Sequence, residues 1–298
     1  MKVLAGSGSR VLGLKVARLL NAEMVDVQVR RFPDGEIYVR LLGEVEGEDV
    51  VLVQSMGKNP NELLVEFLLL ADTLKDLKAR KVIAVVPYFP YARQDARFKP
   101  GEAFSLKTVV KLVEDVGIDA MITVDMHLHR IESPSKIFNI PAFNLTAMPL
   151  LAEYALKTLN LEEPIVVGPD EEAEQWAKTA AESIGSGYLV LSKVRLDDYK
   201  VEISSPQLNR VKGRNVLIVD DIISTGGTMS KAVKQVSEAG AKRIVAACTH
   251  PLLVGDSVYN ILKAGAECVI GSDTVQSHVS YVSVAPIIAN KLKEILFS

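Results

Sequence analysis

Residues 216–228 read Val-Leu-Ile-Val-Asp-Asp-Ile-Ile-Ser-Thr-Gly-Gly-Thr, and this stretch decides the fold of the second half of the chain. Val216–Val219 form an unbroken apolar run, mostly β-branched, which predicts a short buried strand of a parallel sheet. Asp220 and Asp221 (the acid pair) follow where that strand is expected to end. A helix is predicted next, because apolar residues recur at helical spacing and Gly240 stands at its expected C-terminal end: Met229, Ala232, Val233 and Val236.

The segment between this strand and this helix has the composition of a phosphate-binding loop. It consists of Ser224, Thr225, Gly226, Gly227 and Thr228, and is called the Ser/Thr/Gly loop below. Free N–H groups and the helix dipole attract an anion at a helix N-terminus, and glycine lets the ligand approach the backbone. The acid pair cannot bind a phosphate, but it can accept hydrogen bonds from sugar hydroxyls or hold a metal. The combination predicts a sugar phosphate, and the alternative is an ordinary βα turn with two exposed acids.

Length and composition narrow the class of protein. The chain has 298 residues, 48% of them hydrophobic and 24% charged, which is enough for two medium domains with a substantial core. A net charge of −3 argues against a nucleic-acid-binding surface. Cys248 and Cys268 lie too far apart in sequence to form a ligand pair, so neither a disulfide framework nor a zinc site is expected. No stretch is apolar for long enough to span a bilayer, so we expect a cytoplasmic protein that binds no membrane.

Strands alternate with helices throughout, which predicts an α/β fold of mainly parallel sheets flanked by helices. Two domains are expected, at residues 1–148 and 149–298, with the last helix free to pack on the first of them. Ile37–Leu41 alternates in polarity and is predicted as an antiparallel or edge strand. The other predicted strands are Val3–Ala5, Val25–Val29, Val50–Val53, Val82–Val86, Met121–Val124, Ile165–Val167, Tyr188–Leu191, Ile244–Cys248 and Cys268–Ile270. The predicted helices are Val11–Leu20, Asn61–Leu77, Ser105–Val116, Glu171–Ile184, Thr228–Ala239 and Asp256–Ala264.

The two halves of the chain resemble two copies of one repeat. An offset of 123 aligns a valine, a glycine and a histidine, namely Val113, Gly117 and His127 with Val236, Gly240 and His250. If the halves are duplicated, the order of their elements pairs Val82–Val86 with Val216–Val219. It places the polar insert Pro87–Gly101 where the second half has the Ser/Thr/Gly loop.

Two segments of the first half combine aromatic and charged residues. The insert Pro87–Gly101 carries Arg93, Arg97 and Lys99, which offer positive charge for a polyphosphate, beside Tyr and Phe side chains that can pack on a base. Residues 30–36, Arg-Arg-Phe-Pro-Asp-Gly-Glu, have the same mixture. Taken alone, a segment like the first is an exposed loop as often as a binding loop, and a segment like the second is more often a hairpin turn than a binding site.

Together these segments resemble the ribose-phosphate diphosphokinase family, whose motifs occur in the same order over nearly the whole chain. The Ser/Thr/Gly loop with its acid pair is similar to the signature of type I phosphoribosyltransferases, and it lacks the Gly-Lys-Ser/Thr ending of a Walker loop. The remaining motifs are Phe32–Glu36, Tyr91–Asp95, Asp125–His127, Gly168–Asp170 and Lys193–Arg195. The resemblance implies two duplicated phosphoribosyltransferase-like domains.

The resemblance also implies roles for individual residues. ATP would be bound by Phe32, Asp34, Gly35, Glu36, Arg93 and Gln94, and Mg²⁺ by His127, Asp170 and Asp125. Ribose 5-phosphate would be bound by Arg195, Asp220, Asp221, Ser224, Thr225, Gly226, Gly227 and Thr228, and Lys193 with Arg195 would be catalytic. Without the other motifs, His127 would be interpreted as a half-buried histidine at the end of a strand. Lys193 and Arg195 would be interpreted as part of a solvated turn.

In the reaction of this family, the anomeric hydroxyl of ribose 5-phosphate attacks the β-phosphorus of ATP and AMP leaves. Such a transfer depends on alignment and charge neutralisation. The acid pair would hold the ribose 2- and 3-hydroxyls, and the Ser/Thr/Gly loop the 5-phosphate. Lys193 and Arg195 would stabilise charge in the transition state. The sequence shows no obvious side-chain base.

The sequence departs from the family at two places. Glu171–Glu174 follow Asp170 where the family usually has small residues and glycine, and Pro251 follows His250 where a glycine is usual. Three other functions stay open: a phosphoribosyltransferase that consumes phosphoribosyl pyrophosphate, a non-catalytic regulatory relative, and a structural or RNA-binding regulator. The resemblance further implies a homo-oligomer, a dimer or a multiple of dimers, whose subunits share active sites.

Overall fold

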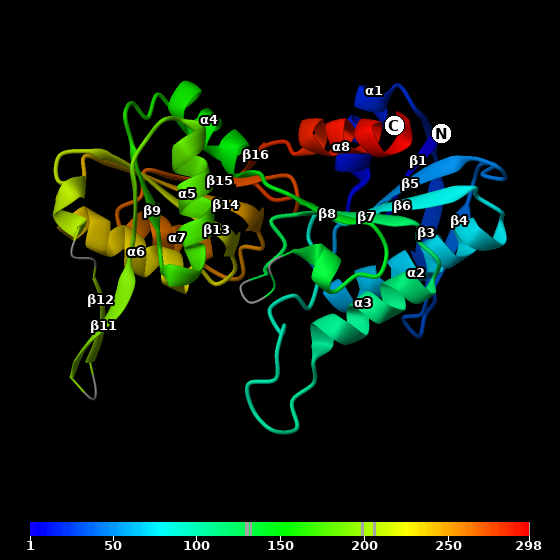
Figure 1. The fold of residues 1–298 in the computed structure, drawn as a ribbon, viewed down its shortest axis with the longest axis horizontal. Helices are drawn as coiled ribbons and strands as arrows, with labels where there is room; N and C mark the ends of the chain where they lie inside the picture. The colour runs from blue at the N-terminus through cyan, green and yellow to red at the C-terminus, as the bar shows by residue number, and fades with distance from the viewer. Residues whose placement is uncertain (129–130, 132, 198–199, 205–206, 298) are drawn as a thin grey trace. The chain divides into compact units, whose positions relative to one another are not determined.

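The structure is a computed structural model that describes residues 1–128, 131, 133–197, 200–204 and 207–297, with the backbone alone for residues 193–197, 200–204 and 297. The chain divides into two units. The first comprises Met1–Leu145, Thr274–Gln276 and Ser283–Ser298, and the second comprises Thr146–Asp273 and Ser277–Val282. Each unit has its own sheet (Figure 1).

The sheet of the first unit has six strands in the order β2-β1-β5-β6-β7-β8, and every neighbouring pair is parallel. Its strands are β1 Lys2–Ala5, β2 Glu23–Val25, β5 Asp49–Val53, β6 Lys81–Val85, β7 Ala120–Val124 and β8 Ala142–Leu145. The helices that follow these strands are α1 Arg10–Leu20, α2 Pro60–Asp76 and α3 Ser105–Asp115, and a 3₁₀ turn, η1, spans Pro134–Lys136.

The sheet of the second unit also has six strands, in the order β10-β9-β13-β14-β15-β16, and its neighbouring pairs are again parallel. Its strands are β9 Ile165–Gly168, β10 Tyr188–Val190, β13 Asn215–Ile223, β14 Arg243–Pro251, β15 Cys268–Ser272 and β16 Ser280–Val282. Its helices are α4 Met148–Lys157, α5 Glu174–Ser183, α6 Gly227–Glu238 and α7 Ser257–Lys263, and its 3₁₀ turns are η2 Glu171–Ala173 and η3 Leu208–Val211.

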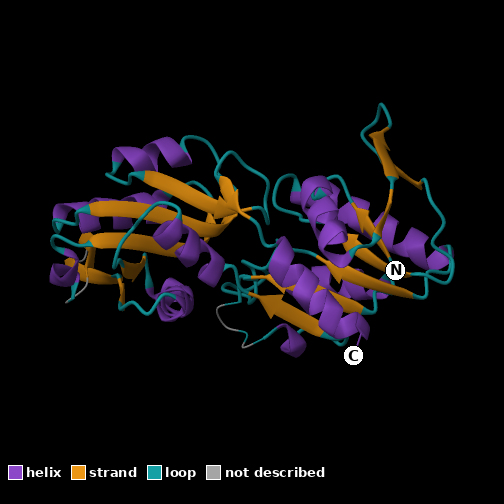
Figure 2. Cartoon of the chain, turned by 90° about the horizontal axis from the view of Figure 1, so that it is seen from above, coloured by secondary structure: helices purple, strands orange, loops and turns teal. Residues whose placement is uncertain are grey.

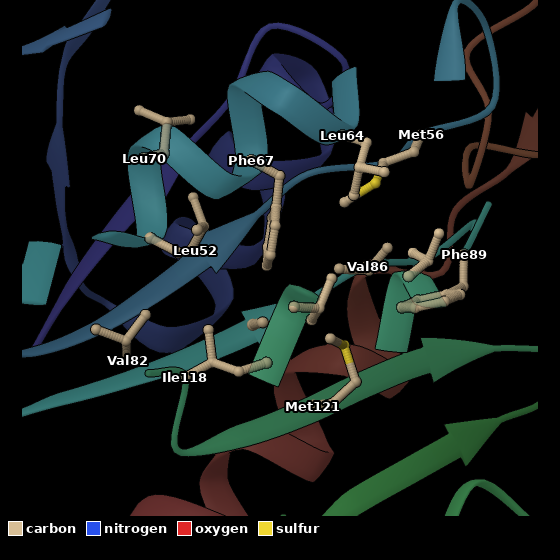
Figure 3. Close-up of a cluster of buried hydrophobic side chains, with 14 of the residues drawn as sticks. Leu52, Met56, Leu64, Phe67, Leu70, Val82, Val86, Phe89, Ile118 and Met121 are labelled. Carbon is tan, nitrogen blue, oxygen red and sulfur yellow. The ribbon is translucent and has the colours of Figure 1, made fainter. Parts of the chain in front are cut away.

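The central strands are buried on both faces, which is why they are continuous apolar runs rather than alternating ones. Val50–Val53 of β5 are fully buried. Figure 3 shows this core in the first unit, where Phe67 of α2 points toward the sheet and lies among apolar side chains from β5, β6 and β7. Helices cover both faces of each sheet (Figure 2). The expected α/β fold of mainly parallel sheets flanked by helices is therefore confirmed.

The two sheets have the same strand order, which makes the duplication visible but corrects the alignment of the halves. Position in the sheet relates β13 to β5 and β14 to β6. The predicted correspondence of Val82–Val86 in β6 with Val216–Val219 in β13 is therefore wrong by one strand. It fails because each sheet repeats a strand–helix unit, so a helix followed by a strand matches the neighbouring unit equally well. The segment equivalent to the Ser/Thr/Gly loop is residues 54–59 after β5, and the insert Pro87–Gly101 corresponds to the loop after β14.

A two-stranded antiparallel ribbon follows the second strand of each sheet. In the first unit it pairs β3 Val27–Arg31 with β4 Ile37–Leu41, as predicted for Ile37–Leu41. The single strand predicted at Val25–Val29 is wrong, because Val25 ends β2 in the main sheet and Val27 begins the ribbon. In the second unit the ribbon pairs β11 Ser192–Asp197 with β12 Lys200–Ser204.

The helix after the last strand of each sheet belongs to the other unit. The chain leaves β8 of the first sheet and forms α4, which packs on α5 in the second unit. After β16 of the second sheet it forms α8 Ala285–Phe297, which packs on α1 in the first unit (Figure 1). Ile288 and Leu292 of α8 are fully buried. The two units therefore exchange equivalent helices.

Within the described ranges, none of the helices is both long enough and apolar enough to cross a bilayer.

Candidate functional site

The acid pair lies inside a strand rather than after it. β13 extends to Ile223, so the strand predicted to end at Val219 continues through both carboxylates. Its parallel partner β14 runs alongside, with Asp220 opposite Cys248 and Ile222 opposite His250. Backbone pairing with β14 satisfies the peptide groups, so polar side chains do not end the strand here. Asp220 is half-buried and Asp221 is buried.

The carboxyl group of Asp220 is in an environment that opposes its negative charge. Burial raises the pKa of Asp220 well above its usual range, and the charges of Asp221 and Asp170 raise this pKa further. Its Oδ1 accepts a hydrogen bond from the backbone N–H of Asp221 at 2.9 Å, which acts in the opposite direction. The charged form would be stabilised by a cation or by donors such as sugar hydroxyls. The structure thus brings Asp170 within electrostatic reach of the acid pair, inside one unit.

The Ser/Thr/Gly loop connects β13 to α6 through a left-handed glycine. Gly226 has φ = +76° and precedes the first helical residue, Gly227. Its carbonyl accepts a hydrogen bond from Ser230 N–H at 2.8 Å, which closes the first turn of α6. Thr225, Gly227 and Thr228 are exposed, and a Cβ at Gly227 would meet nothing closer than 3.9 Å. The N-terminus of α6 is therefore open to an anion on the side of the loop that faces solvent.

The loop that follows β14 contacts the Ser/Thr/Gly loop, and sequence reasoning missed this. Leu253 N–H donates to the carbonyl of Ile223, and Val254 N–H donates to the carbonyl of Ser224, both at 3.0 Å. Ser257, the first residue of α7, packs against Gly226. No pattern links these positions in the sequence, because the contact arises only when β13 and β14 lie side by side in the sheet.

The motif at residues 32–36 forms the tip of the β3–β4 ribbon. The Phe32 N–H donates a hydrogen bond to the carbonyl of Glu36 at 2.9 Å, and Gly35 adopts φ = +100° in the turn between them. Glu36 N–H also donates to Oδ1 of Asp34 at 3.2 Å. The Arg30 guanidinium lies 4.9 Å from the centre of the Phe32 ring, a cation–π contact that orients this exposed aromatic side chain.

Arg93 and Gln94 lie in the insert after β6, and they differ in how firmly they are held. Oε1 of Gln94 accepts a hydrogen bond from Ser105 Oγ at 2.8 Å, at the start of α3. Arg93 is exposed. The turn before them contains Tyr91 at φ = +61°, an uncommon backbone conformation for a bulky residue. The structure places the insert, like the 32–36 tip, in the first unit.

The residues predicted to bind metal are divided between the units. Asp125 follows β7 with φ = +38° and is buried, and His127 lies two residues further along the same loop. Asp170 follows β9 in the second unit, where its Oδ1 accepts a hydrogen bond from Glu172 N–H at 3.1 Å. The helix predicted from Glu171 begins as the 3₁₀ turn η2 before α5. Within the residues that the structure describes, no group of three or more His, Cys, Asp or Glu side chains is gathered for a metal.

Lys193 and Arg195 belong to β11 of the second unit, not to a turn. Lys193 pairs with Ile203 and Arg195 with Val201 across the ribbon. The side chains of Lys193 and Arg195 are outside the described part of the structure.

Comparison with known proteins places these features in one family. The sequence model for the N-terminal domain of ribose phosphate pyrophosphokinase matches residues 1–117, and that for the phosphoribosyl transferase domain matches residues 133–270. The chain is 42% identical to a ribose-phosphate pyrophosphokinase of Methanothermobacter thermautotrophicus, over 98% of this chain and 100% of the relative. It is 41% identical to ribose-phosphate pyrophosphokinase 1 of Archaeoglobus fulgidus, with the same coverage.

The fold agrees with these sequence relationships. A crystal structure of phosphoribosylpyrophosphate synthetase from Mycobacterium smegmatis is similar with a TM-score of 0.88 and 30% sequence identity, and the match covers 99% of this chain and 98% of that one. At this coverage the match extends over both units. The chain therefore belongs to the ribose-phosphate pyrophosphokinase family.

Proposed function

We propose that this chain transfers the diphosphoryl group of ATP to the anomeric hydroxyl of ribose 5-phosphate, giving phosphoribosyl pyrophosphate and AMP. One observation carries the proposal: β13 presents two carboxylates and then leads through the left-handed Gly226 into the open N-terminus of α6. This arrangement offers acceptors for sugar hydroxyls beside donors for a phosphate. The family to which the chain belongs is named for this reaction.

Each part of the proposed site has one task in the reaction. The Ser/Thr/Gly loop binds the 5-phosphate through N–H groups and hydroxyls, and the acid pair accepts hydrogen bonds from the ribose 2- and 3-hydroxyls. The 32–36 tip, with Arg93 and Gln94, binds ATP. Lys193 and Arg195 stabilise negative charge that develops on the transferred group. Alignment of the anomeric hydroxyl with the β-phosphorus and neutralisation of the developing charge together account for the rate enhancement, as in phosphoryl transfer generally.

The residues present fit a magnesium ion. Asp170 and Asp125 carry carboxylate oxygens, the ligands that Mg²⁺ prefers, and the charge of Asp170 reaches Asp220, whose pKa it helps to raise. The proposed ligands are Asp170 in the second unit and Asp125 with His127 in the first. When bound, Mg²⁺ would neutralise charge on the triphosphate. A bound cation would also favour the ionised form of Asp220, because burial and the neighbouring carboxylates raise its pKa.

The identity of the nucleotide product tests the reaction directly. Incubation of the enzyme with ATP, magnesium and ribose 5-phosphate is expected to release AMP in a one-to-one ratio with phosphoribosyl pyrophosphate, as measured by ion-exchange chromatography. ADP as the only nucleotide product would contradict diphosphoryl transfer. Consumption of added phosphoribosyl pyrophosphate with a free base, without any need for ATP, would instead favour a phosphoribosyltransferase.

Replacement of either acid by asparagine tests the role of the acid pair. Asp220→Asn and Asp221→Asn keep the shape of the side chain but weaken its capacity to accept hydrogen bonds from the sugar. Each is expected to raise the KM for ribose 5-phosphate roughly tenfold or more and the KM for ATP much less, since a hydrogen bond to a charged group contributes about 1.5–3 kcal/mol. Steady-state kinetics with each substrate varied gives both values. A change confined to ATP would assign the pair to the metal.

We also propose that the enzyme is a homo-oligomer with active sites shared between subunits. The 32–36 tip supports this, because a ribbon end that carries an exposed aromatic ring and two acids can reach a neighbouring subunit. Inactive Phe32→Ala and Lys193→Ala subunits should restore activity when mixed. A mixed dimer then has one site with both defects and one with neither, so random exchange gives about a quarter of wild-type activity. No recovery after confirmed exchange would place both residues in the site of one subunit.

A further inference from the structure

The loop that follows β14 is held against the Ser/Thr/Gly loop by two backbone hydrogen bonds. They run from Leu253 N–H to Ile223 O and from Val254 N–H to Ser224 O, each 3.0 Å long. Leu253 adopts φ = +52°, which costs a leucine about 1–2 kcal/mol. Such a conformation persists only where surrounding contacts enforce it. The two hydrogen bonds are contacts of this kind, so the position of the β14–α7 loop relative to the Ser/Thr/Gly loop is strongly determined.

Ser257 continues this contact at the left-handed glycine. It is 1% exposed, and a Cβ built on Gly226 would lie 3.1 Å from Ser257 Cβ and 3.1 Å from its carbonyl oxygen. The Oγ of Ser257 has no hydrogen-bond partner among the residues that the structure describes. A buried hydroxyl without a partner costs about 1–3 kcal/mol. Ser257 therefore does not contribute through its hydroxyl group, and its contribution is contact through the Cβ and the backbone.

We infer that Ser257 is a positioning residue for ribose 5-phosphate: its Cβ holds Gly226 in the left-handed conformation that directs the N–H groups of the Ser/Thr/Gly loop toward the 5-phosphate. The inference rests on the proposed function of that loop. Glycine can leave φ = +76° at little cost, because it has no Cβ to restrict it. An adjacent buried group limits such movement, and Ser257 lies directly beside Gly226. Ser257 touches no substrate and acts only through the loop.

The test compares two substitutions of Ser257 with a matched change elsewhere. Ser257→Gly removes the Cβ, whereas Ser257→Ala keeps it and removes only the hydroxyl without a partner. Ala285→Gly is the control, because Ala285 is likewise the first residue of a helix and 1% exposed, but it lies in the first unit. Binding of ribose 5-phosphate to the full-length enzyme is measured by isothermal titration calorimetry without ATP, and the KM for ATP by steady-state kinetics.

Ser257→Gly is expected to weaken ribose 5-phosphate binding roughly tenfold, because a misplaced loop loses aligned donors. Its KM for ATP should stay within about twofold of wild type. The Ser257→Ala variant keeps the Cβ and should bind ribose 5-phosphate with wild-type affinity. Ala285→Gly should also bind it as wild type does. If Ser257→Gly does not fold, Ser257→Val replaces it, since added methyl groups would displace Gly226 and weaken binding similarly.

Two negative results have different meanings. Equal affinities of wild type and the glycine or valine variant would overturn the positioning role of Ser257 and leave the proposed function intact. Failure of the wild-type enzyme to bind ribose 5-phosphate would overturn the proposed function of the loop. A loss of affinity in Ala285→Gly equal to that in Ser257→Gly would also overturn the inference, because the effect would then follow from any glycine at a helix start.

Discussion

Replacement of Gly226 by alanine is expected to weaken ribose 5-phosphate binding roughly a hundredfold, which corresponds to about 2.7 kcal/mol. Two effects act together. A residue with a Cβ in the left-handed region costs about 1–2 kcal/mol. The new Cβ would also lie 3.1 Å from Ser257 Cβ and 3.1 Å from its carbonyl oxygen, closer than ordinary carbon contacts. The Ser/Thr/Gly loop must move to accept it. Isothermal titration calorimetry with ribose 5-phosphate measures the change.

Gly213→Ala is the matched control for this prediction. Gly213 has φ = +71°, close to the φ of Gly226, but a Cβ there would meet nothing within 4 Å. The control therefore introduces the backbone strain without the contact, in a turn before β13 and away from the Ser/Thr/Gly loop. It should lower thermal stability and leave ribose 5-phosphate binding unchanged. Wild-type affinity in Gly226→Ala would mean that this loop does not hold the phosphate.

Removal of the Lys193 amino group is expected to lower turnover by about 10²–10³, the size of effect seen when one donor to a developing negative charge is lost. Binding of ribose 5-phosphate by Lys193→Ala should change little, because the proposed interaction is made in the transition state and not in the ground state. Single-turnover measurement of AMP formation, together with calorimetry of sugar binding, separates the two. Unchanged turnover would make Lys193 an ordinary solvated residue of the ribbon.

Lys200 provides the control for Lys193. It lies on β12, where it pairs with Asp197 of β11, so it is a second lysine of the same ribbon. Lys200→Ala changes the net charge by the same amount but removes no residue of the Lys193–Arg195 motif. Its turnover should stay close to that of wild type. Equal losses in both variants would indicate that the positive charge of the ribbon matters, and not a specific interaction of Lys193.

Hydrophobic periodicity predicted well those helices that bury one face against a sheet. The predicted helix Val11–Leu20 differs from α1 by one residue, and Ser105–Val116 differs from α3 by one. Hydrophobic periodicity failed where polar residues lie within a strand whose pairing with its neighbour continues. The acid pair suggested the end of a strand, but the parallel neighbour β14 continues alongside and keeps β13 extended to Ile223. Short edge strands such as β8 and β16 have too few residues to show a pattern, and they were missed.

The candidate site was predictable as far as it depends on short motifs. Phe32, Gly35 and Glu36 lie at a ribbon tip as expected, since a Gly-containing turn between two short strands is a local signal. The contact of Ser257 with Gly226 was not predictable, because residues 31 positions apart become neighbours only through the order of strands in the sheet. The misplaced repeat alignment has the same origin: sequence similarity between strand–helix units does not reveal which strand of the sheet each one forms.

The exchange of helices determines which unit can be completed first during synthesis. Domains ordinarily fold as they leave the ribosome, the N-terminal one first. Here the second unit is complete once Val282 has been made, whereas the first unit still lacks α8. Until Ile288 and Leu292 are added, the apolar surface of α1 that they cover stays open to water. The N-terminal unit is thus the last to be finished, and a nascent chain arrested before residue 285 is exposed to aggregation in the part of the molecule that was made first.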